Sequence, residues 1–239
     1  MRAPFFAAVS AFAIMAASPA IADCVAGVGG PRDYLCTGTF SISSSNPDAR
    51  TLTLQGAKID GLFGFQPIVG GNIGFSMDAG SSITNTNGSW HVSTAGFYLY
   101  TSNGTIDTGT PNGTGINGSI YSLYGTALTA LTTGANSNIN ITTGATSLLS
   151  GKEGGLQARV DNNGAINLNL AGKITSSDGT GVSVQAVDGS INIKLDADVT
   201  TAGDGVQALT TGKGAINLSG AGDIASSSGL GVNAQALGG

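Results

Sequence analysis

The last third of the chain consists of short segments in which apolar and polar residues alternate, and these segments recur at a constant spacing. In the first of them, Ile166, Leu168 and Leu170 alternate with asparagines. The same arrangement begins again at Ile191 and at Ile216, so the spacing is identical each time. Alternation with period two is typical of a half-buried β-strand, whereas a helix needs apolar residues three and four positions apart. We therefore expect each unit to begin with a strand.

Each unit also contains a second strand-like segment. It is a glycine-led run of small, aliphatic and polar residues, found at 181–186, 205–208 and 231–236. Between the two segments a single apolar residue recurs in register, at Ile174, Val199 and Ile224, and is followed by small turn residues. A fixed period in this range indicates a repeat architecture. Short strands and glycine-rich turns predict an all-β fold, a right-handed parallel β-helix (solenoid) in which one unit of about 25 residues forms one coil.

In such a β-helix, inward aliphatic side chains stack into columns along the axis at the inter-strand spacing of roughly 4.8 Å. The register also predicts two outward columns, one of Asn167, Asn192 and Asn217 and one of Lys173, Asp198 and Asp223. In the second column the first pair of charges attracts and the second pair repels. At an exposed surface each effect is worth at most about 1 kcal/mol.

The repeat extends towards the N-terminus with decreasing regularity. The segment 138–141 matches the first strand of the unit, and a fainter copy begins at Gly71 and includes Ile73 and Ile83. From about residue 88 to 135 we expect less regular coils with a projecting loop or hairpin. We therefore divide the exported chain into a cap with the first coils at 23–65, irregular coils at 66–137 and regular repeats at 138–239.

The start of the chain, at 1–22, has the features of a secretory signal peptide. Arg2 provides the positive charge, the segment 5–17 is almost wholly apolar, and Ala20 and Ala22 precede a predicted cut before Asp23. The apolar stretch is too short for a good transmembrane helix. We therefore expect export through the inner membrane.

Cys24 and Cys36 are the only cysteines and follow this predicted cut. An even number of cysteines in an exported protein favours a disulfide, which would contribute about 3 kcal/mol through loop entropy. The first coil of a β-helix has an unpaired edge that needs covering. We therefore expect residues 24–36 to form a disulfide-stapled cap or first hairpin. A zinc site is disfavoured because His91 is the only histidine.

Composition excludes several classes of function. The chain of 239 residues has a net charge of −5, and only 10% of its residues are charged. An acidic chain lacks the basic face that nucleic-acid binding and attachment to anionic lipid require. We therefore expect no nucleic-acid partner.

We expect no catalytic residues, no cofactor and no metal site. The sequence contains neither a Gly-x-Ser-x-Gly elbow nor a serine-protease motif, and Glu153 is its only glutamate. A β-helical polysaccharide lyase or hydrolase would need clustered carboxylates, or calcium-binding aspartates beside a basic residue, in one groove. The aspartates of this chain are scattered instead.

The aromatic residues of the irregular part are the best candidates for a binding patch. They are Trp90, Tyr98, Tyr100, Tyr121 and Tyr124. Exposed tyrosine and tryptophan bind sugars and protein partners well. The simpler interpretation, which we favour, is that these side chains fill the interior of wider, irregular coils.

The signal peptide, the cysteine pair with Cys36-Thr37-Gly38-Thr39, and the Gly-Ala-Ile-Asn type repeats together resemble the passenger regions of bacterial autotransporters. The resemblance covers most of residues 23–239. It implies a β-helix that is displayed at the cell surface as an adhesin or a stalk. It also implies membrane association through a C-terminal β-barrel, which this sequence does not contain.

From these observations we expect an exported, monomeric, non-enzymatic protein with a structural or adhesive role. Its partners would be glycans or proteins of host or neighbouring cells. It would lie at the cell surface or in the medium as part of a longer chain, and in the periplasm if the chain ends at Gly239. The alternatives are a β-helical carbohydrate-active enzyme and a truncated, non-functional remnant.

Overall fold

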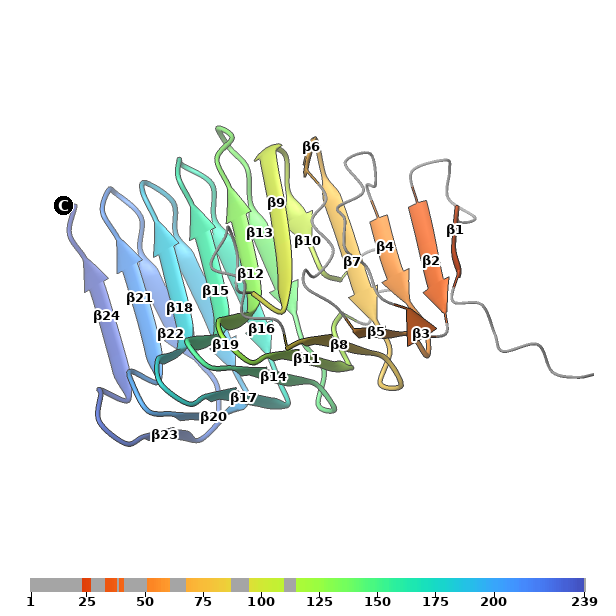
Figure 1. Cartoon of the computed structure of the whole chain (residues 1–239). Helices are drawn as coiled ribbons and strands as arrows, with labels where there is room; N and C mark the ends of the chain where they lie inside the picture. Colours follow the sequence, from red (N-terminus) through yellow and green to blue (C-terminus); the bar gives the residue numbers. More distant parts are fainter. Residues whose placement is uncertain are drawn as a thin grey trace, which may run out of the picture.

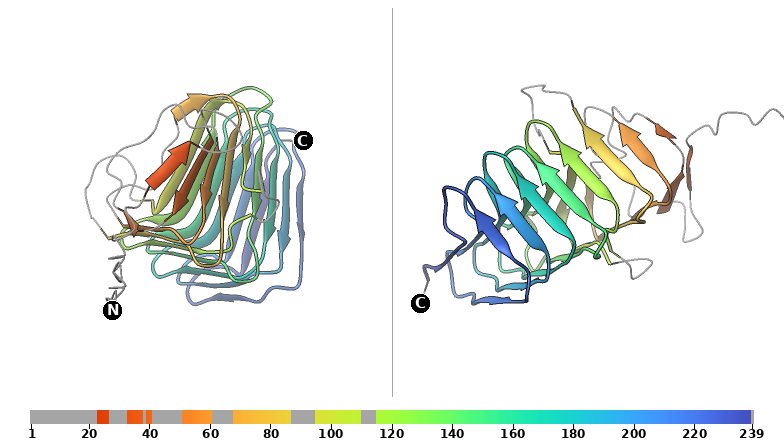
Figure 2. Two further views of the ribbon diagram at one scale, coloured as in Figure 1. Left: turned by 90° about the vertical axis from the view of Figure 1, so that its right-hand side faces the viewer. Right: turned by 90° about the horizontal axis from the view of Figure 1, so that it is seen from below.

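The computed structural model describes residues 23–26, 33–37, 39–40, 51–60, 68–86, 95–109 and 115–238. These residues form a parallel β-helix, as the repeat predicts (Figure 1). Three strands make one coil, and successive coils stack into three sheets, which we number 1 to 3 in the order in which each coil passes through them. Figure 2 shows the coils lying behind one another along the axis. The predicted signal peptide lies outside the described residues, which include no helix that is long and apolar enough to cross a membrane.

Sheet 1 contains the first strand of each coil, including the asparagine-rich strands. Its nine strands follow one another in coil order. They are β1 (Asp23–Ala26), β2 (Asp33–Thr37), β4 (Thr51–Leu54), β7 (Ile73–Met77), β10 (Ile106–Asp107), β13 (Ile139–Thr142), β16 (Ile166–Leu170), β19 (Ile191–Leu195) and β22 (Ile216–Ser219).

Sheet 2 contains the strands that the sequence pattern did not predict as strands. Ile174, Val199 and Ile224 were expected only as isolated apolar positions, but each lies within a short strand of this eight-stranded sheet. Its strands are β3 (Thr39–Phe40), β5 (Lys58–Asp60), β8 (Ser82–Asn85), β11 (Ser119–Ser122), β14 (Leu148–Gly151), β17 (Lys173–Ser176), β20 (Asp198–Thr201) and β23 (Ile224–Ser226).

Sheet 3 contains the second strand-like segment of each unit and completes the coil. Its seven strands run upwards at the front of Figure 1, with sheet 2 below them. They are β6 (Ile68–Gly70), β9 (Phe97–Asn103), β12 (Thr126–Thr132), β15 (Gly154–Val160), β18 (Thr180–Ala186), β21 (Val206–Thr210) and β24 (Val232–Ala236).

The core is a set of aliphatic columns that run along the axis between the sheets. In sheet 1 one column contains six isoleucines in register, at positions 73, 106, 139, 166, 191 and 216. The first five are almost fully buried, and burial of such a side chain contributes about 1.5–3 kcal/mol. This column confirms the faint repeat at Ile73. The coils between Ile73 and Ile139 are longer than those of the regular repeats, but the register is kept.

The N-terminal end of sheet 1 is covered by a hairpin. Strand β1 pairs antiparallel with β2, whereas every other described strand pair is parallel. The hairpin places a paired strand over the outer edge of β2, which confirms the expected first hairpin. Its register sets Cys24 directly opposite Cys36, and the Cys36 side chain is buried. The disulfide between the two cysteines stays a prediction.

Candidate binding surfaces

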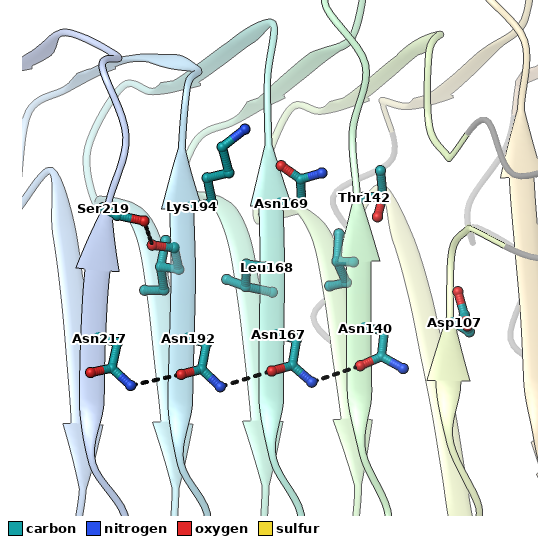
Figure 3. A pocket seen from close by; sticks show the side chains of 12 residues that line it. Asp107, Asn140, Thr142, Asn167, Leu168, Asn169, Asn192, Lys194, Asn217 and Ser219 are labelled. Atoms are coloured by element: carbon teal, nitrogen blue, oxygen red, sulfur yellow. Dashed lines mark hydrogen bonds between the residues drawn. The ribbon is translucent and has the colours of Figure 1, made fainter.

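The outer face of sheet 1 carries a ladder of asparagine side chains along the axis, which confirms the predicted asparagine column (Figure 3). The side-chain Nδ2 of each asparagine after Asn140 donates a hydrogen bond to Oδ1 of the asparagine in the preceding coil. The three bonds join Asn217 to Asn192 at 2.8 Å, Asn192 to Asn167 at 2.9 Å and Asn167 to Asn140 at 2.9 Å. The ladder therefore connects four successive coils.

The ladder forms because the strands hold these side chains in register and on one face. Alternation within β16 buries Ile166 and Leu168 and turns Asn167 outward, and the parallel pairing sets Asn167 opposite Asn192. A primary amide has two N–H donors and two acceptor lone pairs. Asn167 and Asn192 therefore each keep one N–H group and one lone pair that the ladder does not use.

A second column of outward side chains lies two residues further along the same strands. It contains Thr142, Asn169, Lys194 and Ser219, which are paired in register. The two columns line a shallow groove of about 470 Å³, shown in Figure 3. Asp107 lies at the N-terminal end of this groove, where its Oδ1 accepts a hydrogen bond from the backbone N–H of Gly109 at 2.7 Å. The groove is thus lined mainly by neutral hydrogen-bonding groups.

Lys194 is the one cationic side chain among the described residues that line this groove, and it forms an ion pair. Its Nζ lies 2.7 Å from Oδ2 of Asp196. The hydrogen bond from Lys194, followed by one from the backbone N–H of Ala221, lowers the pKa of Asp196. Both side chains are more than one third exposed, so solvent screens the pair.

The predicted charged column on sheet 2 is also present. Lys173 pairs in register with Asp198, and the backbone N–H of Asp223 donates a hydrogen bond to Oδ1 of Asp198 at 3.4 Å. The ion pairs within 4 Å among the described residues do not involve this column. One joins the turns of two neighbouring coils, and the other two join residues that are two positions apart in the sequence near the end of a strand. In that order, they join Lys152 to Asp178, Arg159 to Asp161 and Lys194 to Asp196.

The expectation that the tyrosines fill the core is wrong for the four that were named. Tyr98 and Tyr100 are only partly buried on the outer face of β9, while Tyr121 and Tyr124 are 37% and 42% exposed. The wide coils are filled instead by Phe75 and Phe97, whose ring centroids lie 4.3 Å apart. Trp90 and His91 lie outside the described residues.

The four tyrosines do not form one patch. Tyr98 and Tyr100 stack on sheet 3, with ring centroids 6.3 Å apart and an interplanar angle of 9°. Burial, followed by the nearby Tyr100 and Asp161, raises the pKa of Tyr98. Tyr121 belongs to β11 of sheet 2, and Tyr124 lies in the turn that leads to β12 of sheet 3. These last two, together with Leu123, line a groove of about 520 Å³ at the corner between sheets 2 and 3.

The described residues contain no group of three or more His, Cys, Asp or Glu side chains that could hold a metal ion. Glu153 and the described aspartates occupy turns and strand ends. The two grooves are therefore the surfaces on which a binding function can be argued.

Comparison with known proteins identifies no relative. No protein-family model, no curated protein and no solved structure matches the chain.

Proposed function

We propose that this chain is an exported, passenger-like β-helical protein with a structural or adhesive role at the cell surface. The parallel solenoid fold is compatible with such a role. Its partners would be glycans or proteins on host or neighbouring cells, reached by export through the inner membrane. We propose no enzymatic activity for it.

The asparagine ladder is the observation that carries this proposal. It repeats the same donor and acceptor groups on four coils at the inter-strand spacing of roughly 4.8 Å. Such a row suits a partner that is itself extended or repetitive, because each coil offers the same small contribution. A small substrate that must be held in one place requires convergent groups instead.

The test has two parts, and the first is localisation. Intact native cells are treated with a protease that does not cross membranes, and the chain is followed with antibody to residues 138–239. Surface display predicts that the chain is digested, while a periplasmic marker survives. A chain that is digested only after the cells are lysed would contradict surface display.

The second part measures adhesion. Beads coated with residues 23–239 are expected to attach to cell surfaces, and removal of surface glycans or proteins from the cells identifies the class of partner. The test variant carries Asn140→Ser, Asn167→Ser and Asn192→Ser in the ladder. The matched control carries Gln157→Ser, Gln185→Ser and Gln207→Ser on the outer face of sheet 3. If both variants attach equally well, the ladder does not contribute to adhesion. Release of products from acidic polysaccharides incubated with the chain would favour the enzyme alternative.

A further inference from the structure

Exposed apolar side chains are concentrated at one corner of the β-helix. Outside the last coil, the large apolar side chains of the described residues that are at least 36% exposed are Tyr121, Leu123, Tyr124 and Leu148. Three of these four lie on β11 and the turn that follows it. In the coils after it, the positions in register with Tyr121 are Ser150, Thr175 and Thr200. The exposed side chains of Tyr121, Leu123 and Tyr124, which we call the ledge, therefore lie beside a row of small hydroxyl residues, which we call the floor. The floor consists of Ser150, Thr175 and Thr200, and ledge and floor together line the groove of about 520 Å³.

Three hydrogen bonds fix the backbone at the end of β11 and in the turn that follows it, where Tyr121 and Tyr124 lie. The Ser122 side chain is buried, and its Oγ accepts a hydrogen bond from the backbone N–H of Gly125 at 3.0 Å. The N–H of Leu123 donates to the carbonyl of Asn85 in the preceding coil at 2.9 Å, and the N–H of Glu153 in the next coil donates to the carbonyl of Gly125 at 3.2 Å. Tyr121 and Tyr124 are thus exposed on a fixed backbone, which lowers the entropic cost of binding through them.

We infer that this corner is a binding subsite for a neutral saccharide. An aromatic ring packs against the C–H face of a sugar ring, while the sugar hydroxyls need hydrogen-bonding partners beside it. The groove offers both, with Tyr121 and Tyr124 on the ledge and the hydroxyls of Ser150, Thr175 and Thr200 on the floor. At an inter-strand spacing of roughly 4.8 Å, this floor has room for about two or three sugar rings.

Charge argues for a neutral sugar over an acidic one. Among the described residues that line the groove, Lys152 is the only charged one, and its Nζ already lies 3.6 Å from Oδ2 of Asp178. An acidic sugar would have to displace or approach that carboxylate. A peptide strand is also disfavoured, because β11 is paired on both sides, to β8 and to β14, and offers no free edge.

This inference rests on the proposed adhesive function and names the class of ligand for one site of it. The test titrates residues 23–239 with cellohexaose, maltohexaose and chitohexaose as neutral probes and with hexagalacturonate as the acidic probe, using calorimetry and saturation-transfer NMR. We expect at least one neutral probe to bind and to place its ring protons against tyrosine. The double variant Tyr121→Ala/Tyr124→Ala is expected to weaken that binding by about tenfold or more.

Two further variants keep the test independent of folding. The matched control Tyr98→Ala/Tyr100→Ala removes two partly exposed tyrosines from sheet 3 and is expected to leave binding unchanged. Ser150→Tyr keeps both corner tyrosines but fills the groove, so it is expected to abolish binding. Unchanged binding in Tyr121→Ala/Tyr124→Ala, or preference for hexagalacturonate, would overturn the inference.

The outcome also separates this inference from the proposed function. If the chain binds none of the four probes while beads coated with it still attach to cell surfaces, the saccharide subsite is overturned and the adhesive role stands. A chain that binds neither probes nor cell surfaces would overturn both.

Discussion

Asn192 is an interior member of the amide ladder and makes two side-chain hydrogen bonds along the axis, one to Asn167 and one from Asn217. Replacing it with alanine removes both bonds, so Asn217 loses its ladder partner while Asn167 keeps its bond to Asn140. Because these groups are exposed and water can replace the bonds, we expect Asn192→Ala to lower the free energy of unfolding by about 1 kcal/mol. Urea unfolding followed by circular dichroism measures the change.

Two variants make this prediction specific to the ladder. Asn217→Ala removes only one ladder bond and is expected to cost about half as much. Gln185→Ala changes an outward residue of sheet 3 and is expected to be nearly neutral. Equal effects at all three positions would mean that the ladder bonds do not contribute to stability.

Asp196 provides a prediction about pH. Its pKa is lowered mainly by the hydrogen bond from Lys194, so the folded chain releases this proton more readily than the unfolded chain. The sign follows from linkage: the stabilisation is present above the unfolded pKa and is lost as the pH falls through the folded pKa. We expect a carboxyl-carbon NMR titration to place Asp196 below the ordinary aspartate pKa, and Lys194→Met to move it upwards. An unchanged pKa in Lys194→Met would assign the shift to the backbone N–H of Ala221 instead.

Glycines at the start of the sheet 3 strands set how closely sheets 2 and 3 meet. A Cβ atom on Gly181 would lie 2.4 Å from Cγ1 of Val199, and Gly155 and Gly205 meet Ile174 and Ile224 in the same way. Because the core has no spare volume there, we expect Gly181→Ala to destabilise the chain by about 1–3 kcal/mol. Val199→Ala removes the clashing methyl group, so the double variant is expected to be more stable than the sum of the two single effects predicts.

The control for this cycle is Gly80→Ala, because a Cβ atom there meets its nearest neighbours at 3.7 Å, an ordinary contact. Rescue will be incomplete, since the carbonyl oxygen of Gly205 also lies 2.7 Å from the added Cβ of Gly181. Strict additivity of Gly181→Ala and Val199→Ala would show that the two residues do not meet.

The N-terminal hairpin leads to a prediction about the disulfide between Cys24 and Cys36. Since the register sets Cys24 opposite Cys36, we expect thiol labelling of the denatured, unreduced chain to find no free thiol. Reduction is expected to lower the free energy of unfolding by about 3 kcal/mol. The double variant Cys24→Ser/Cys36→Ser serves as the control and should match the reduced chain. Two labelled thiols without reductant would rule the bond out.

The strands that the sequence predicted and those it did not differ in one physical respect. In β16 all three inward residues are aliphatic, so alternation is visible in the sequence. In β17 the inward residues are Ile174 and Ser176. Ser176 can be buried because its Oγ donates a hydrogen bond to the carbonyl of Lys152 and accepts one from the N–H of Gly179. A serine that is buried because its hydroxyl forms hydrogen bonds to the backbone of a turn cannot be told from a surface serine in the sequence. The pattern therefore did not predict the strands of sheet 2.

The exposure of Tyr121 was missed for the same reason, a buried serine next to it in the strand. Ile120 and Ser122 are buried, so Tyr121 between them must point outward. The outward position of Tyr121 therefore follows from the alternation of this strand. The alternation is hard to recognise in the sequence, because one of the two inward residues, Ser122, is polar. The hydroxyl floor depends on which residues of later coils stand beside Tyr121. Ser150, Thr175 and Thr200 follow one another at the regular repeat spacing, but the step from Tyr121 to Ser150 is longer, so sequence spacing alone did not place this row in line with Tyr121.

At the scale of the whole molecule, each coil packs only on the coils before and after it, so stability is nearly a sum over neighbours. Removal of residues 189–213 deletes β19, β20 and β21 and joins Asp188 to Gly214, which occupies the same place in the unit as Gly189. The shortened chain can pair β16 with β22 and rejoin the ladder between Asn167 and Asn217. We expect it to fold, with an unchanged circular dichroism spectrum per residue and a urea m-value reduced in proportion to the lost coil.

The matched control is a deletion of residues 189–200, about half a unit, which removes β19 and most of β20, brings the turn before β21 and the start of this sheet 3 strand to the place of a sheet 1 strand, and puts the apolar columns out of register. It removes fewer residues than the full-unit deletion but is expected to be far more disruptive, with lost cooperativity or aggregation from unpaired strands. A core held together by long-range contacts, as in a globular domain, predicts the opposite order, with the larger deletion doing more harm. The comparison of the two unfolding curves therefore tests whether the coil is the unit from which this molecule is built.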